Sequence, residues 1–188
     1  MYNGPLPFVF EDRTGQLYGS DFDEMYDRMF YRVARDPQRI ATMVYNMGRR
    51  ASRHRDSLPF NSRPIAILDF KPDQSLGNIC YASNGNVAVP MSRYLRRTSM
   101  FGGSLSRKFT GSDGREYRWS HRSIQGQEWT CTTGPENFLV AHFDLKAADV
   151  PAYDVSGNTL TIFEQFIHIS VEILASLTIM RHIAQHNL

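Results

Sequence analysis

The sequence predicts a mainly β fold with α, built as an antiparallel barrel or sandwich, and three observations support this. Between residues 64 and 164, apolar and polar residues alternate with a period of two in short runs separated by turn residues. Residues 20–48 instead carry apolar side chains at helical spacing. Residues 164–188 form a broadly apolar stretch without Gly or Pro, which predicts a C-terminal helix.

The composition is that of a soluble globular protein. The chain has 188 residues, of which 41% are hydrophobic, 12% aromatic and 21% charged, and this length fits a single domain, 1–188. No basic segment followed by an apolar run opens the sequence, so we expect no secretory signal. Two cysteines, Cys80 and Cys131, favour a reducing compartment such as the cytosol, and a bridge between them stays open.

The N-terminal part is predicted to contain one strand and a helical insertion. Residues 7–12 ("PFVFED") are typical of a strand. We expect a helical insertion over residues 20–48, because Ser20 or Asp21 can cap a helix with an acidic first turn. Apolar residues then recur at helical spacing: Met25, Met29, Phe30 and Val33. A second helical piece, "QRIATMVYNMG", ends at Gly48.

Basic residues are concentrated in the middle of the chain. Residues 49–64 are predicted to be a basic loop, and a solvated loop is a better interpretation than a nucleic-acid patch. Residues 49–122 hold fourteen Lys and Arg against five acidic residues, a surplus of nine. Such a surface attracts phosphate and anionic lipid, although arginines on exposed strand faces also simply keep a sheet soluble.

Eight short segments after residue 64 are predicted to be strands. Pro90 indicates an edge or a bulge in the third segment, residues 86–97. Turn sequences separate them, such as "SNGN" at 83–86 and "SDGR" at 112–115. The segments are residues 64–70, 76–82, 86–97, 106–111, 115–122, 128–133, 138–145 and 158–164.

Residues 113–133 ("DGREYRWSHRSIQGQEWTCTT") contain both tryptophans and one cysteine. Alternation places the large side chains of both arms on the inner face and Arg118 on the outer face. The inner set is Tyr117, Trp119, Trp129 and Cys131. A packed, unreactive thiol is therefore the preferred interpretation of Cys131 over a nucleophile.

The C-terminal helix is apolar over most of its circumference and needs cover on most sides. Its longest uninterrupted apolar run is shorter than a membrane span requires, and the helical stretch contains two acidic residues, Glu164 and Glu172. A buried core helix is thus preferred over a transmembrane helix.

Several motifs together resemble a known family. They are the "DGREYRW" hairpin, the "WTC" strand, "VAHFDL", "GNTLTIFE" and the apolar C-terminal helix, and they extend over about residues 64–183. In these features the chain resembles an uncharacterised fungal domain family of the tubby C-terminal-like superfamily, which includes scramblase and LURP-one-related proteins. The resemblance implies a single tubby-like domain: an antiparallel closed β-barrel around the hydrophobic C-terminal helix. It also implies binding of phosphoinositide or another anionic membrane lipid through basic surface residues.

Eight basic residues are candidates for such binding, since arginine suits bidentate contacts with phosphate. They are Arg93, Arg96, Arg97, Arg107, Lys108, Arg115, Arg118 and Arg122. Nucleic acid is disfavoured as a partner, because the inward-facing aromatic residues leave no stacking platform.

A polar pocket near the C-terminal helix is the alternative hypothesis. His142, His168 and Glu172 are its weak catalytic candidates, as part of an enzyme or a small-ligand binder. His182 and His186 stand four residues apart, but no further ligand matches them, so we predict no metal and no cofactor.

Together these patterns favour a non-enzymatic binding module for an anionic membrane lipid or a protein partner. We expect it to be cytoplasmic, with peripheral attachment to membranes if it binds lipid. The sequence leaves the ligand and the oligomeric state open.

Overall fold

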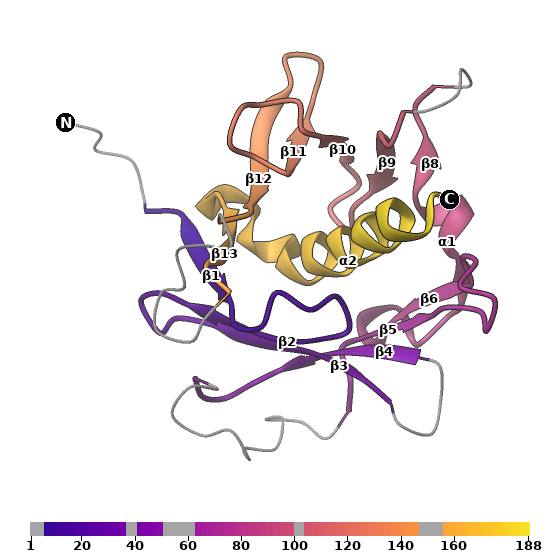
Figure 1. The fold of residues 1–188 in the computed structure, drawn as a ribbon, viewed down its shortest axis with the longest axis horizontal. Helices are drawn as coiled ribbons and strands as arrows, with labels where there is room; N and C mark the ends of the chain where they lie inside the picture. The colour runs from indigo at the N-terminus through magenta and orange to yellow at the C-terminus, as the bar shows by residue number, and fades with distance from the viewer. Residues whose placement is uncertain (1–5, 37–40, 51–62, 100–103, 147–155) are drawn as a thin grey trace.

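The computed structural model describes residues 6–36, 41–50, 63–99, 104–146 and 156–188. Within these residues, thirteen strands form one antiparallel sheet in the order β7-β6-β5-β4-β3-β2-β1-β13-β12-β11-β10-β9-β8. The sheet curls around α2, which runs through the middle of the molecule (Figure 1). The mainly β prediction with a central C-terminal helix therefore agrees with the observed layers.

The described residues contain thirteen strands, two helices and two 3-10 segments. The strands are β1 (Phe8–Asp12), β2 (Gly19–Glu24), β3 (Phe30–Arg35), β4 (Ala41–Asn46), β5 (Ala66–Asp69), β6 (Asn78–Tyr81), β7 (Val89–Pro90), β8 (Arg96–Arg97), β9 (Arg107–Thr110), β10 (Glu116–His121), β11 (Trp129–Thr133), β12 (Phe138–Asp144) and β13 (Asn158–Ile162). The helices are α1 (Met91–Tyr94) and α2 (Ser170–His186), with 3-10 segments η1 (Ala82–Asn84) and η2 (Glu164–Ile169).

The sheet is not closed, so the predicted closed β-barrel is wrong. β1 pairs with β13, which joins the first and last strands, but β7 and β8 are edge strands that do not pair with each other. Each has two residues, and α1 connects them by a single helical turn. Pro90 in β7 lacks the N–H that a further ladder bond would need. The sheet is therefore left with a seam between β7 and β8, and α1 contacts β6, β7 and β9 there.

The predicted N-terminal helical insertion, residues 20–48, is also wrong where it is described. This stretch forms β2, β3 and β4, with Phe22 opposite Tyr31 and Val33 opposite Val44. The side chains of all four residues are buried in the core. Met25 and Met29, which helped to predict the helix, lie between β2 and β3, and pairing with β1 and β5 stabilises the strands. Residues 37–40 of the predicted insertion and most of the predicted basic loop, 51–62, lie outside the described residues.

The hairpin of β10 and β11 has the predicted orientation. Tyr117, Trp119, Trp129 and Cys131 are all buried, whereas Arg118 is exposed. Cys80 and Cys131 are both free thiols. Burial raises the pKa of the Cys131 thiol, which makes it a poor nucleophile.

Helix α2 is the centre of the hydrophobic core. Most of its residues are buried, among them Ile173, Leu177 and Met180. By length and composition the stretch Glu164–His186 could cross a membrane, and 72% of its apolar window is buried inside the protein. We interpret it as a core helix, because the curled sheet supplies the cover that its wide apolar surface needs.

Polar side chains of α2 are bonded to several strands of the sheet. The Trp119 indole donates to Ser176 Oγ over 2.9 Å, and the hydroxyls of Tyr31 and Ser170 lie 2.7 Å apart. His182 donates from Nε2 to the Gln74 carbonyl oxygen, so its Nδ1 accepts from the hydroxyl of Tyr18. These bonds fix both the depth and the rotation of the helix inside the sheet.

Candidate functional site

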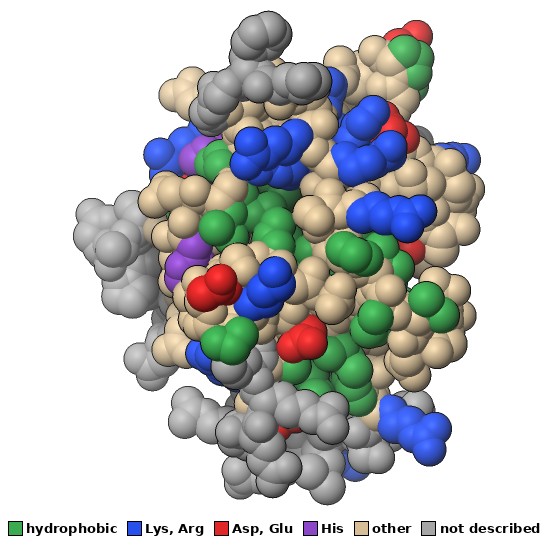
Figure 2. All heavy atoms as spheres, turned by 90° about the vertical axis from the view of Figure 1, so that its right-hand side faces the viewer, with side chains coloured by type: hydrophobic (Ala, Val, Ile, Leu, Met, Phe, Trp, Pro, Cys, Tyr) green, Lys and Arg blue, Asp and Glu red, His purple; other side chains and the backbone are tan. Residues whose placement is uncertain are grey.

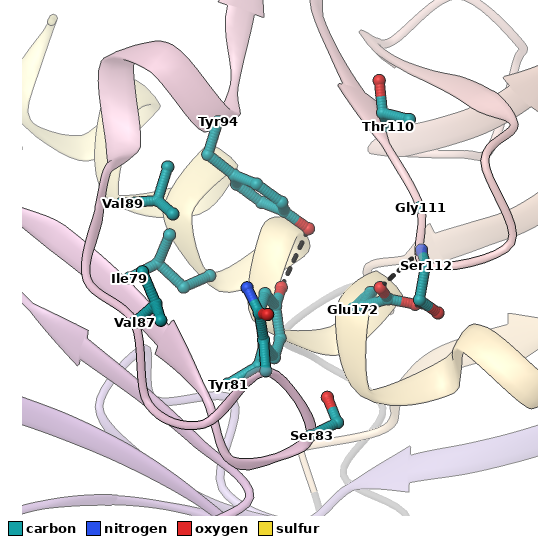
Figure 3. Close-up of a pocket in the computed structure, with 11 residues that line it drawn as sticks. Ile79, Tyr81, Ser83, Val87, Val89, Tyr94, Thr110, Gly111, Ser112 and Glu172 are labelled. Atoms are coloured by element: carbon teal, nitrogen blue, oxygen red, sulfur yellow. Dashed lines mark hydrogen bonds between the residues drawn. The ribbon is translucent and has the colours of Figure 1, made fainter.

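A pocket of about 450 Å³ lies at the seam of the sheet. One wall comes from β6, β7 and the loop between them, the other from the end of β9 and the following turn, and α2 contributes Glu172 (Figure 3). This volume lies in the range of pockets that hold small molecules. The lining residues are Ile79, Tyr81, Ser83, Asn84, Val87, Val89, Tyr94, Thr110, Gly111, Ser112 and Glu172.

The first wall is apolar and aromatic. Ile79, Val87 and Val89 lie together on it, and the hydroxyls of Tyr81 and Tyr94 point toward each other (Figure 3). These two hydroxyl oxygens are 2.8 Å apart. Burial raises the pKa of both tyrosines, so both hydroxyls keep their protons at neutral pH. The mutual hydrogen bond uses one of the two protons, and the second can be donated to another acceptor.

Glu172 and Ser112 form the polar side of the pocket. The Ser112 backbone N–H donates to Glu172 Oε1 over 2.8 Å, and its hydroxyl donates to Oε2 over 3.2 Å. Burial raises the pKa of Glu172, and the negative charge of Asp113 adds to the rise, whereas the two bonds from Ser112 and the charge of His168 oppose it. Each carboxylate oxygen has a further lone pair for a ligand.

The edge of β9 adds backbone groups to this side. The Gly111 N–H bonds the Arg115 carbonyl, toward β10. Alternation in an antiparallel ladder therefore turns the N–H and C=O of Thr110 away from β10 and toward the seam. β8 pairs only with Lys108 and Arg107 of β9, so it stops short of Thr110.

Asp113 and His168 form a separate contact beside Glu172. Asp113 Oδ2 accepts a bond from the Tyr117 hydroxyl over 2.6 Å and lies 3.1 Å from His168 Nε2. Although burial opposes ionisation, the bonds from Tyr117 and His168 lower the pKa of Asp113. His168 is thus engaged with Asp113, one helical turn before Glu172.

Of the three weak catalytic candidates, Glu172 alone lines the pocket. His142 lies on β12, with Nδ1 2.9 Å from Asp144 Oδ2 on the same strand. Among the described residues, no group of three or more His, Cys, Asp or Glu could hold a metal ion.

Three of the eight basic candidates form a row on the outer face of the sheet. Strand register places Lys108 between Arg96 and Arg118 on β8, β9 and β10. Glu116 pairs with Arg96 at 3.2 Å and with Lys108 at 3.1 Å, and Arg118 donates to the Asn137 side chain. We call Arg96, Lys108 and Arg118 the outer basic row.

The other five basic candidates lie elsewhere. Arg107 is buried and donates to the Ser104, Ser106 and Leu188 carbonyl oxygens, so it does not belong to the outer face. The side chain of Arg115 lies 3.8 Å from Asp113, and that of Arg122 lies 2.8 Å from Glu128. Arg93 and Arg97 are exposed on α1 and β8. Figure 2 faces the right-hand side of Figure 1, and it shows Lys and Arg side chains around hollows lined by hydrophobic side chains.

Sequence reasoning missed Tyr81, Tyr94 and Ser112 as site residues. Ser112 was recognisable as a turn residue in "SDGR", and both tyrosines lay in predicted strand segments. These residues line one pocket only because the seam brings distant parts of the chain together. The bond from Ser112 to Glu172, for example, joins residues that are 60 positions apart.

The fold and the pocket define a β-sheet domain wrapped around a core helix, with a ligand-sized cavity where the sheet stays open. The chain belongs to a family of unknown function, DUF6593, whose model matches residues 17–186. No curated protein and no solved structure matches it. The relation to tubby C-terminal-like proteins stays a prediction.

Proposed function

We propose that this protein is a small-ligand-binding module and that its binding site is the seam pocket. The observation that carries the proposal is the position of Glu172, a partly buried carboxyl group in a cavity of about 450 Å³ whose other lining side chains are uncharged. A cavity of this size with a few convergent polar groups is the usual form of a ligand site. A titratable group with a shifted pKa inside it supports the same conclusion.

The place of the pocket in the fold supports this function. Elsewhere in the described sheet, neighbouring strands pair along their edges, but at the seam the pairing stops and a cavity remains. A ligand there can contact two walls from distant parts of the chain. Binding at the seam would therefore join the two edges of the sheet and stabilise the folded state.

A fragment screen by ¹⁵N NMR on the whole chain tests this function. Neutral and charged fragments at roughly 1 mM cover the weak affinities that a first screen detects. We expect hits that shift the amide signals of Val87, Val89 and Ser112. The Val87→Trp variant, which fills the mouth of the pocket, should lose them. Phe138→Trp is the matched control, because Phe138 is equally exposed and lies outside the pocket. A complete absence of hits at the pocket contradicts the proposal.

Peripheral binding to anionic lipid is a second candidate, favoured by the outer basic row. Its three cations stand in register on neighbouring strands against a single carboxylate, Glu116. Such a row can attract a phosphorylated headgroup.

Liposome co-sedimentation tests whether the outer basic row binds anionic lipid. Phosphoinositide vesicles should pellet the protein at low salt, and the double variant Arg96→Gln, Arg118→Gln should abolish this. Arg35→Gln serves as the control, because Arg35 is an exposed cation on β3, which is several strands away from the row in both directions around the curled sheet. Equal pelleting of wild type and double variant would rule the row out.

A further inference from the structure

The charge of the seam pocket is one-sided. Of the described residues that line it, Glu172 has the one acidic side chain, and none is Lys, Arg or His. An anionic ligand would therefore meet a carboxylate with no cation in the pocket lining to offset it. A positively charged ligand instead supplies the missing counter-charge, and this matters more in a partly buried site than in open solvent.

The nearby positive groups compensate Glu172 only in part: His168 lowers its pKa, but neither His168 nor Arg115 forms an ion pair with it. Both His168 and Arg115 lie against Asp113, at 3.1 Å and 3.8 Å respectively. Ser112 gives Glu172 two neutral hydrogen bonds and no charge. Glu172 thus has hydrogen-bond donors from the protein but no ion-pair partner of its own in the described residues.

The other walls suit the remaining parts of an organic cation. Aromatic rings attract cations through their faces, and Tyr81 and Tyr94 provide two rings whose centroids are 5.9 Å apart. The Thr110 carbonyl and the tyrosine hydroxyl oxygens can accept further N–H bonds. Ile79, Val87 and Val89 can cover a short hydrocarbon body.

We propose that the seam pocket binds a small primary amine, with its ammonium group against the Glu172 carboxylate and its hydrocarbon body on the wall of Ile79, Val87 and Val89. This inference rests on the proposed function and names its ligand class.

The pH dependence of binding follows from the groups around Glu172. Asp113, His168, Tyr81 and Tyr94 face it from the β9–β10 turn, η2, β6 and α1. Both tyrosines stay neutral, and Asp113 is ionised at neutral pH. The amine has its ordinary pKa near 10 and is charged throughout the neutral range. Affinity should therefore fall as the pH drops and Glu172 takes up a proton.

Calorimetric titration of the whole chain with hexylamine, hexanol and hexanoate tests the ligand class, because the three probes share one hydrocarbon body. We expect hexylamine to bind at least tenfold more tightly than hexanol, and hexanoate to bind more weakly than either. In Glu172→Gln the affinity for hexylamine should fall at least tenfold while that for hexanol stays within about twofold. Glu136→Gln removes an exposed carboxylate elsewhere and should change neither value.

Each outcome decides the inference. Retained binding of hexanol shows that Glu172→Gln still folds around the pocket, and the wild-type ranking of the three probes needs no variant. Hexanoate binding as tightly as hexylamine, or hexylamine binding unchanged in Glu172→Gln, overturns the amine inference but leaves a ligand pocket. Failure of all three probes, together with an empty fragment screen, overturns both.

Discussion

The two ends of α2 hold their polar side chains in different ways. Near the C-terminus, Arg181 donates to the Gly15 carbonyl oxygen over 2.8 Å and lies 3.5 Å from Asp12 Oδ2. Its neighbour His182 has a protein partner on each ring nitrogen. Near the N-terminus of the helix, Glu172 meets one turn of the sheet and a cavity. One helix thus carries both structural contacts and a candidate binding group.

The difference follows from the continuity of the sheet around the helix. Arg181 and Asp12 face the part where β1 pairs with both β2 and β13. Glu172 faces the seam, where α1 replaces strand pairing. Under the continuous sheet, Arg181 and His182 have protein partners, whereas Glu172 under the seam keeps an open side, which we propose a ligand fills. Substitutions near the C-terminal end of α2 should therefore lower stability, whereas substitution of Glu172 near its N-terminal end should lower binding and leave stability nearly unchanged.

The largest effect on stability is expected at Asp12. Its carboxylate is fully buried and also accepts bonds from the Gly15 N–H and the Ser20 hydroxyl. Asp12→Ala leaves the Arg181 guanidinium, whose side chain is 16% exposed, without its counter-charge, so the free energy of unfolding should fall by about 3 to 5 kcal/mol. Urea denaturation measures this loss. Glu136→Ala, at an exposed position, should change stability by less than about 0.5 kcal/mol, and a similarly small effect at Asp12 would contradict the account.

A smaller loss is expected where the middle of α2 meets β10. Ser176→Ala removes the acceptor of the fully buried Trp119 indole N–H. An unsatisfied buried donor should lower the free energy of unfolding by about 1 to 3 kcal/mol. The exposed Ser83→Ala is the matched control for thermal and urea unfolding. Equal stability of both variants would show that the Trp119 bond contributes nothing.

At Glu172 we expect little change in stability at neutral pH. Gln keeps an acceptor for Ser112, and it removes a charge that burial disfavours, so the two effects should cancel to within about 1 kcal/mol. Because burial raises the folded-state pKa of Glu172, its protonated form stabilises the fold at low pH. That contribution is lost as the pH rises above the ordinary value near 4.5. As the pH rises, the free energy of unfolding of Glu172→Gln should therefore increase relative to that of wild type. Urea unfolding of both proteins from pH 4 to 8 measures the sign of this difference.

The smallest effect on folding is expected in the outer basic row. Arg118 is exposed, and its partner is the neutral side chain of Asn137. Arg118→Gln should change the free energy of unfolding by less than about 0.5 kcal/mol. A larger loss would mean that the row serves the fold rather than a partner.

Alternation in the sequence predicted the β10–β11 hairpin correctly, but it did not predict that α1 interrupts the strand expected over residues 86–97. The inward face of Tyr117, Trp119, Trp129 and Cys131 followed from alternation within single strands. The same local reasoning failed at residues 20–48, because it grouped Met25 and Met29, which lie between β2 and β3, with Val33 of β3 on one helical face. Pairing with β1 and β5 instead fixes this stretch as strands.

The open seam and the site depended on tertiary structure. Barrel closure is decided by the length of β7 and β8 and by the single turn of α1. Glu172 could be recognised as a polar residue on an apolar helix. Its bond to Ser112 and the pairing of Tyr81 with Tyr94 could not be predicted without the arrangement of the strands.

An NMR titration of the ¹⁵N-labelled chain with hexylamine tests the central claim most directly, because the Ser112 amide donates to Glu172. We predict saturable shifts of the Ser112, Gly111 and Val89 amides, which are strongly reduced in Glu172→Gln and unchanged in Glu136→Gln. Shifts confined to exposed acidic residues such as Glu116 and Glu136, with the Ser112 signal unmoved, would contradict the assignment of the seam pocket as the binding site.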